Sequence, residues 1–445
     1  MRKILAILSL VAFAAFAAQA QLKITPLNIK ERTLANGLKV VSVQDTSSPA
    51  VAVQVWYNVG SKNDPVGRSG FAHLFEHMMF KSTKNMKSEM IDRLTEDVGG
   101  EGSNASTSDD FTDYIDVVPS NNLEALIWAE ADRMVNLSVD EANFKSERAV
   151  VQEEFRQSVL AQPYGLLEEA IQQNTFDVHP YKRTTIGSIE DLEAATNADA
   201  EKFYKTYYRP DNAMLVVVGD FDQAQFDGWV DKYFNKISKP TGTIPRITEV
   251  EPERTKEKRV VVKAPNVPLP AVAITYLAPP EKDKDAAALT IAAAVLSRGD
   301  SSRLYQELVY KQQIAQEADF EFNGHADQGW MYFTATMASG KTVEEGEKSL
   351  LAELKKMQDA PVSTQELEKA KNLVIAGNIR QLETNKGKTF ALGATWIMEG
   401  DPKLVNSQVA KLQAVTASDV QRVMKKYFTD TNRVVIYYQN EENAK

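Results

Sequence analysis

The sequence predicts an α+β protein made of two similar halves. Short runs rich in β-branched residues, such as 39–43, 51–57 and 216–218, are interspersed with long amphipathic patterns that indicate helices, such as 123–137 and 140–160. This mixture is typical of an α+β fold. The chain has 445 residues, which is too long for one hydrophobic core, so we expect two or more domains.

Two pairs of matching segments predict the duplication. Residues 49–57 resemble residues 270–276, and residues 208–218 resemble residues 428–438. Both pairs are separated by about 220 residues. Because two independent matches share nearly one offset, the simplest explanation is a repeated domain of that length.

The beginning of the chain is typical of a secretory signal peptide. A basic start, Met1-Arg2-Lys3, is followed by the apolar run 4–18 and by the small-residue sequence Ala18-Gln19-Ala20. The apolar run is too short for a stable membrane span. We expect cleavage after Ala20 and a periplasmic or secreted protein without a membrane anchor.

The rest of the chain divides around one linker. The stretch 239–256 carries several prolines among charged residues and is typical of a linker. We therefore expect a signal peptide at 1–20, an N-terminal domain at 21–238, and a homologous C-terminal domain at 257–445.

Composition excludes several classes of function. The chain has no cysteine, so disulfides and thiol catalysis are excluded. Its formal net charge is −10, and no basic block is present. Nucleic acids and anionic membrane surfaces are therefore poor partners for this protein.

The segment 70–80 is the most informative part of the chain. It holds two of the four histidines, His73 and His77, with Glu76 between them. On a helix the three side chains share one face. Two imidazoles at this spacing can bind one Zn²⁺, and a glutamate beside them can serve as general base for the water of the metal. The alternative is a pair of surface histidines. The order H-x-x-E-H is the inverted form of a zinc-protease signature.

A third ligand is expected further along the chain, because a catalytic zinc site uses three protein ligands. The acidic segment 147–154 is a candidate. Glu147 and Glu154 are two helical turns apart and share a face, whereas Glu153 points about 100° away from Glu154. The residues alone do not rank these glutamates, and they favour a solvated acidic helix face.

The two motifs together resemble a known family. H-x-x-E-H and the later E-R-x-V-V-x-E-E, with 76 residues between His77 and Glu154, are together similar to the pitrilysin/insulinase family of zinc metallopeptidases, the inverzincins. The smaller branch of that family contains the mitochondrial processing peptidase and bacterial relatives. The resemblance implies one Zn²⁺ per chain, held by His73, His77 and Glu154. It implies catalytic roles for Glu76, as the base, and for Glu147, as a supporting carboxylate.

The same resemblance implies the architecture. Each half is expected to be a mixed β-sheet covered by helices, and the two halves are expected to enclose a cavity. The metal motif occurs only in the first half. At the offset of the repeat, His73 corresponds to Ala294, which lies in an apolar segment typical of a core helix.

Substrate contacts are expected between the two motifs. The glycines around residues 99–102 indicate a turn, and a plain turn is one interpretation of the segment. In the family, the corresponding Asn-Ala-x-Thr is an edge strand that an extended substrate joins through backbone hydrogen bonds. The resemblance therefore implies that Asn104 and Ala105 bind substrate. The remaining histidines, His179 and His325, are expected to be structural and at the surface, respectively.

The second half departs from the family pattern. Family members commonly carry S-R-L-x-x-x-L-R and a Tyr seven residues later, but here Val309 and Gln316 occupy the Arg and Tyr positions. Arg303 and Tyr310 have the same spacing in the wrong register. Losing both groups should cost about 2–4 kcal/mol of transition-state stabilisation, by analogy with oxyanion donors.

These observations predict a zinc-dependent metalloendopeptidase that hydrolyses peptides or unfolded segments, with Glu76 activating the water. The missing Arg and Tyr add a hypothesis about partners. The chain would form a homodimer, or a heterodimer with a zinc-less relative that supplies Arg and Tyr. The alternative function is a non-catalytic assembly or binding protein of the same fold.

Overall fold

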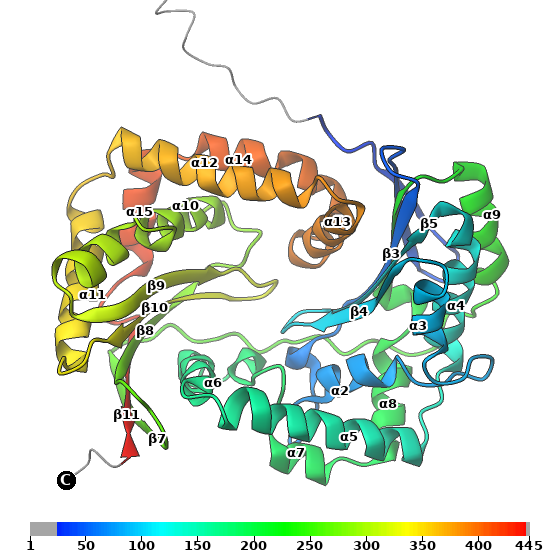
Figure 1. Cartoon of the computed structure of the whole chain (residues 1–445), viewed down its shortest axis with the longest axis horizontal. Helices are drawn as coiled ribbons and strands as arrows, with labels where there is room; N and C mark the ends of the chain where they lie inside the picture. The colour runs from blue at the N-terminus through cyan, green and yellow to red at the C-terminus, as the bar shows by residue number, and fades with distance from the viewer. Residues whose placement is uncertain (1–24, 442–445) are drawn as a thin grey trace, which may run out of the picture.

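The computed structural model describes residues 25–441, so the predicted signal peptide lies outside the described residues. Two mixed β-sheets form the centre of the two halves (Figure 1). The first has the strand order β1-β2-β6-β3-β5-β4, and the second has the order β7-β11-β8-β10-β9. The strands are β1 Lys30–Thr33, β2 Lys39–Gln44, β3 Ala50–Tyr57, β4 Glu101–Thr107, β5 Thr112–Pro119, β6 Ala213–Gly219, β7 Lys258–Ala264, β8 Ala271–Ala278, β9 Ala315–Asn323, β10 Gly329–Met337 and β11 Arg433–Asn440.

Helices surround both sheets. Those before the second sheet are α2 Phe71–Met78, α3 Met90–Glu96, α4 Leu123–Asn136, α5 Glu141–Phe155, α6 Gly165–Thr175, α7 Ile189–Ala194, α8 Asn197–Tyr207 and α9 Gln223–Tyr233. Those after it are α10 Ala286–Ser297, α11 Val343–Asp359, α12 Thr364–Gln381, α13 Asn385–Glu399, α14 Gln408–Ala414 and α15 Ala417–Tyr427. Short 3₁₀ or π segments are η1 Ser61–Asn63, η2 Ser120–Asn122, η3 Arg156–Leu160, η4 Pro180–Lys182, η5 Pro210–Asn212, η6 Tyr305–Lys311 and η7 Pro402–Ser407.

Five strands of each sheet have the same topology, which confirms the two homologous halves. In the first sheet β2 runs parallel to β6, and β3 lies antiparallel between β6 and β5. In the second sheet β7, β11, β8 and β10 repeat this arrangement. Asn212 donates to the carbonyls of Asn58 and Tyr207, and Asn432 donates in the same way to Leu277 and Tyr427.

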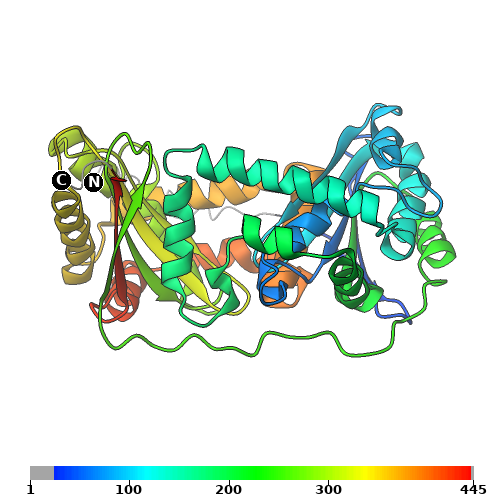
Figure 2. The same cartoon turned by 90° about the horizontal axis from the view of Figure 1, so that it is seen from below.

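One helix of each half packs on the sheet of the other half. Leu167 and Ile171 of α6 belong to a hydrophobic cluster with Ala273 and Ile436 of the second sheet. Leu392 of α13 belongs to a cluster with Trp56 and other residues of the first sheet. Figure 2 shows α6 beside the second sheet. We call this reciprocal packing the helix exchange.

The local predictions from sequence are confirmed. The runs 39–43, 51–57 and 216–218 lie in β2, β3 and β6, and the pattern 123–137 forms α4. The pattern 140–160 forms α5, followed by a π-helical turn.

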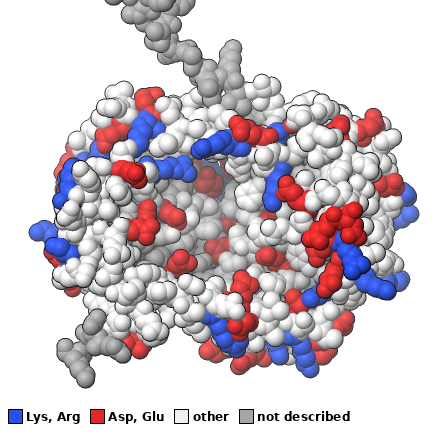
Figure 3. Space-filling model, viewed as in Figure 1, with Lys and Arg blue, Asp and Glu red and all other residues white. Residues whose placement is uncertain are grey.

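The domain boundaries stay a prediction. Residues 234–257 contain no helix or strand, and they run along the outside from one half to the other (Figure 2). The helix exchange nevertheless means that each sheet needs residues from both sides of this segment. Within residues 25–441, no helix is long and apolar enough to cross a membrane. The surface is hollowed between the two halves, and Asp and Glu side chains lie on its walls (Figure 3).

Candidate metal centre and active site

Helix α2 presents the H-x-x-E-H motif because its other face is buried. Phe71, Leu74 and Phe75 are fully buried in the core of the first half, so His73, Glu76 and His77 fall on the opposite, half-buried face. The N-terminus of the helix is fixed by Asp64, whose carboxylate accepts hydrogen bonds from the backbone N–H groups of Gly70 (2.7 Å) and Ala72 (2.9 Å). Such bonds satisfy N–H groups that have no partner inside the helix.

Helix α5 supplies the acidic residues that face α2. The carboxylate of Asp140 caps its N-terminus by accepting from the backbone of Ala142 and Asn143. Buried Phe144 and Val151 hold the helix against the core. Glu147 and Glu154, two turns apart, therefore point to the same side, toward α2.

The predicted ligands meet between the two helices. One ligand atom from each of His73, His77 and Glu154 lies within 4.8 Å of the others. The Oε2 atom of Glu154 is 3.8 Å from Nε2 of His73 and 3.5 Å from Nε2 of His77. Two imidazoles and one carboxylate are the donor set of many catalytic zinc sites, and they leave a position open for water or substrate.

The protonation of His73 also suits a metal. Burial, together with the neighbouring His77, lowers the pKa of His73 to about 4. The ring is therefore neutral at neutral pH, which is the form that binds a metal ion. The residues present thus fit a zinc ion.

Glu76 lies on the same helix face with a defined partner. The hydroxyl of Thr107, the last residue of β4, donates to Oε2 of Glu76 at 2.5 Å. Burial raises the pKa of Glu76 to about 7, although the bond from Thr107 works in the opposite direction. A carboxylate with such a pKa can both accept and return a proton near neutral pH.

Glu147 stands behind His77. Its side chain is 5 % exposed, and its Oε2 atom is 3.8 Å from Nδ1 of His77. Lys81 Nζ, at 2.7 Å, and the hydroxyl of Ser146, at 2.9 Å, hold its other oxygen. Glu153 points away from the site and contacts Arg156. The arrangement is that of a carboxylate able to orient a metal-binding imidazole.

The segment around Asn104 and Ala105 is an edge strand, so the interpretation as a plain turn is wrong. These residues lie in β4, the last strand of the first sheet, and pair with Ile115 and Tyr114 of β5. Asn104 is exposed and Ala105 is half-buried. The outer edge of β4 can thus accept an added strand.

Val309 and Gln316, at the positions of the family's Arg and Tyr, can supply neither a charged donor nor a phenol. Val309 packs against the core of the second half, and Gln316 is exposed on β9. Arg303 is engaged by Glu366, with Nε 2.8 Å from the carboxylate. Tyr310 is 67 % exposed. The seven-residue spacing of Arg303 and Tyr310 is therefore a local feature of the second half and does not correspond to the Arg and Tyr of the family.

The remaining histidines differ from each other. His179 is buried, and its Nδ1 accepts a hydrogen bond from the backbone of Tyr181 at 3.2 Å, so the expectation of a structural role is confirmed. The expectation of a surface position for His325 is wrong. Its Nε2 accepts from Trp330 at 2.9 Å and its Nδ1 lies 3.0 Å from a carboxylate oxygen of Asp110. Asp110 lies 215 residues away in sequence, so no local pattern could have revealed the contact.

Comparison with known sequences gives matches in both halves. Residues 39–188 match the family described as Insulinase (Peptidase family M16), and residues 194–374 match the family described as Peptidase M16 inactive domain. The chain is 33% identical over 407 residues to a protein of Helicobacter pylori named zinc protease PqqE, covering 91% of each chain. It is 24% identical to the probable mitochondrial-processing peptidase subunit beta of Arabidopsis thaliana, covering 89% of this chain and 76% of that protein.

Comparison with solved structures agrees. The crystal structure of a protease from Helicobacter pylori matches with a TM-score of 0.89 and 33% identity, covering 93% of this chain and 100% of that one. A structure from Pseudomonas fluorescens described as a peptidase M16 inactive domain matches with a TM-score of 0.82 and 17% identity, over 93% of this chain and 98% of that one. The second match concerns the fold alone.

Proposed function

The chain belongs to the insulinase-type peptidase family M16, and from this premise we propose that it is a zinc-dependent metalloendopeptidase. The observation that carries the proposal is the cluster of His73, His77 and Glu154 on two facing helices. Glu76 lies on the same face and has a fixed hydrogen-bond partner. A chain with only a structural role would have no chemical use for this glutamate.

Each residue of the site has a role in the proposed reaction. His73, His77 and Glu154 would hold one Zn²⁺, which when bound supplies Lewis acidity toward the scissile carbonyl and lowers the pKa of water. Glu76 takes a proton from the attacking water and returns it to the leaving amine. Thr107 holds the carboxylate of Glu76 in place, and Glu147 orients His77.

The proposed substrates are extended peptides or unfolded segments. The free edge of β4 favours this class because strand addition uses backbone hydrogen bonds, which every sequence offers. Asn104 and Ala105 would contact the substrate there. The hollow between the halves supports the same class (Figure 3). A folded protein also presents few free strands that could join the edge of β4.

A direct test is cleavage of a quenched, unstructured peptide library by the purified chain, with and without a zinc chelator. We expect chelator-sensitive cleavage that Glu76→Gln lowers by about 10²- to 10⁴-fold while bound zinc is unchanged. Glu153→Gln is the matched control, because Glu153 is exposed and points away from the site. Substantial activity in Glu76→Gln would refute the assigned mechanism.

The alternative of a non-catalytic binding protein is supported by the incomplete second half. Val309 and Gln316 stand where the resembled family has Arg and Tyr, and residues 194–374 match a family described as inactive. Turnover decides between the two functions, whereas zinc content alone does not. Absence of any cleavage by a zinc-loaded chain would favour the binding protein.

The same gap motivates a proposal about partners. A zinc-less relative would supply the Arg and Tyr in a heterodimer, whereas in a homodimer both copies would lack them. The similarity to a protein named as a subunit supports a paired arrangement. Activity per chain should then rise with protein concentration or on adding the relative. Gln316→Tyr, on an exposed strand position, should raise the activity of the isolated chain. A rate that changes neither with protein concentration nor on adding the relative would exclude the requirement for a partner. We also propose that the protein is exported, on the basis of residues 1–20.

A further inference from the structure

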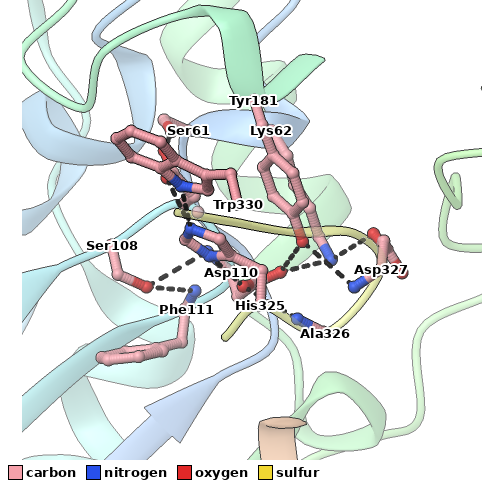
Figure 4. A network of polar contacts seen from close by, with 12 residues as sticks. Ser61, Lys62, Ser108, Asp110, Phe111, Tyr181, His325, Ala326, Asp327 and Trp330 are labelled. Atoms are coloured by element: carbon pink, nitrogen blue, oxygen red, sulfur yellow. Dashed lines mark hydrogen bonds and ion pairs between the residues drawn. The ribbon is translucent and has the colours of Figure 1, made fainter. Parts of the chain in front are cut away.

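A buried polar network joins the loop between β9 and β10 to the first half (Figure 4). Its centre is the fully buried carboxylate of Asp110, in the connection between β4 and β5. One oxygen of Asp110 accepts from Lys62 Nζ at 2.8 Å and from the hydroxyl of Tyr181. The other oxygen faces the second half, where Nδ1 of His325 lies at 3.0 Å and the backbone N–H of Ala326 donates at 3.2 Å.

The hydrogen bond from Trp330 decides which ring nitrogen of neutral His325 carries the proton. The indole N–H of Trp330 donates to Nε2 of His325 at 2.9 Å. Because an indole nitrogen can only donate, Nε2 must be the unprotonated nitrogen. The proton of the neutral ring therefore sits on Nδ1 and points at Asp110. His325 acts as an oriented hydrogen-bond donor between the halves.

The network holds Asp110 as a charged carboxylate. Burial works to raise the pKa of Asp110, but the bond from His325 and the charge of Lys62 hold it well below its ordinary value. Lys62 Nζ also contacts Asp327 of the same loop at 2.8 Å. The second half thus contributes His325 and a backbone N–H to the buried cluster, and Asp327, whose side chain is 41 % exposed, adds a second carboxylate to Lys62. A buried ion group with this many partners defines one geometry, because alternatives leave a charge unpaired.

Both elements that carry the site are attached to this cluster. Asp110 lies three residues after Thr107, which donates to Glu76, and Ser108 fixes the intervening turn by accepting from the backbone of Asp110 at 3.1 Å. Lys62 lies two residues before Asp64, the residue that caps α2. Two backbone bonds join the segments, from residue 61 to the carbonyl of residue 108 and from residue 62 to that of residue 109.

We propose that the β9–β10 loop positions the site of the first half, with His325 as the central positioning residue. By holding Asp110, His325 fixes the turn that places Thr107 against Glu76. In this way the second half supports catalysis although Val309 and Gln316 stand at the positions of the family's Arg and Tyr. The inference rests on the proposed peptidase function.

The first test compares three variants of the zinc-loaded, full chain with the quenched peptide library. His325→Ala should lower kcat by about 10- to 100-fold, the cost of a small misplacement of catalytic groups, with KM changed little. His325→Asn keeps an N–H donor toward Asp110 and should recover most of kcat. The control is Glu321→Gln on β9, because Glu321 is exposed and bonds only to Tyr332 among the contacts of its side chain. Unchanged kcat in His325→Ala, or no recovery in His325→Asn, would overturn the proposal.

The second test is independent of turnover. Hydrogen exchange without substrate should be faster for residues 57–64 and 101–111 in His325→Ala than in the wild type, and unchanged in Glu321→Gln. If His325→Ala does not fold, Trp330→Phe replaces it, since it frees the ring of His325 while keeping an aromatic side chain. A wild type that cleaves nothing, alone or with the relative, refutes the proposed function, and exchange still decides whether the loop holds the turn. Unaltered exchange in both variants refutes the positioning role.

Discussion

The two halves place different helices at the same point of one topology. In the first half β3 leads to α2, which carries two histidines and a glutamate on a half-buried face. In the second half β8 leads to α10, most of whose residues are buried and apolar. Val374, about 220 residues after Glu154, is also buried. The comparison teaches that this fold accepts either a cluster of His and Glu side chains or apolar packing between the same helices, so the chemistry lies in a few side chains.

The largest expected effect comes from removing one proposed zinc ligand of the first half, since the second half has an apolar residue at the corresponding position. Glu154→Ala should lose both bound zinc and peptide cleavage, because two imidazoles alone are one ligand short of a catalytic site. The measurements are zinc per chain by elemental analysis and cleavage rate. Glu153→Ala, on the same helix, should retain both. Zinc that stays at one per chain in Glu154→Ala would remove this residue from the ligand set.

The next effect concerns Glu147, the buried carboxylate beside His77. Glu147→Gln should lower zinc affinity or activity by about 10- to 100-fold, as is typical of residues that orient a ligand. Zinc titration and cleavage rate measure the two quantities. A variant indistinguishable from the wild type in both would limit Glu147 to packing with Lys81.

A smaller effect tests the contact between the halves. A Cβ at Gly393 of α13 would lie 1.9 Å from the ring of Trp56, whereas a Cβ at Gly377 of α12 would meet nothing within 4 Å. Gly393→Ala should therefore lower the free energy of unfolding by about 1–3 kcal/mol. Gly377→Ala should raise it by up to about 1 kcal/mol, since alanine favours helix. Chemical denaturation measures the free energy of unfolding of both variants. Changes of the same sign in the two variants would contradict the observed packing.

The smallest effect is an ion pair between the halves. Lys388 of α13 lies 2.5 Å from the carboxylate of Asp45, and mainly this bond lowers the pKa of Asp45 from 3.8 to about 2. A lowered pKa contributes stability above pH 3.8 that is lost as the pH falls toward 2. Asp45→Asn should cost about 1 kcal/mol at pH 7, because the pair is only partly buried. The free energies of unfolding of the wild type and Asp45→Asn should converge near pH 2. A difference that does not change with pH would contradict an origin in the ionised carboxylate of Asp45.

Features that depend on neighbouring residues could be predicted from the sequence. The run 51–57 gives β3, and the four-residue spacing of His73 and His77 gives one helix face, since both follow from the period of the backbone. Glu154 needed the resemblance to a family, because three nearby glutamates have equivalent local surroundings.

Features that depend on distant residues could not be predicted. The segment around Asn104 is rich in Gly and Ser, and only its pairing with β5 makes it a strand. His325 has no local signal for its contact with the first half, because Asp110 lies 215 residues away in sequence. The helix exchange is equally hidden, since an amphipathic pattern shows that α13 packs on something apolar and does not say on which sheet.

The helix exchange has a consequence for the order of events during synthesis. In chain order the first sheet is completed by β6, which ends at Gly219, yet α13, which covers Trp56, spans Asn385–Glu399. At typical synthesis rates, the ribosome needs roughly 10–40 s to make the intervening chain. During this interval the Trp56 face is uncovered and open to other apolar surfaces. A chain released before residue 385 would carry His73, His77 and Glu154 and still lack the cover of its first sheet.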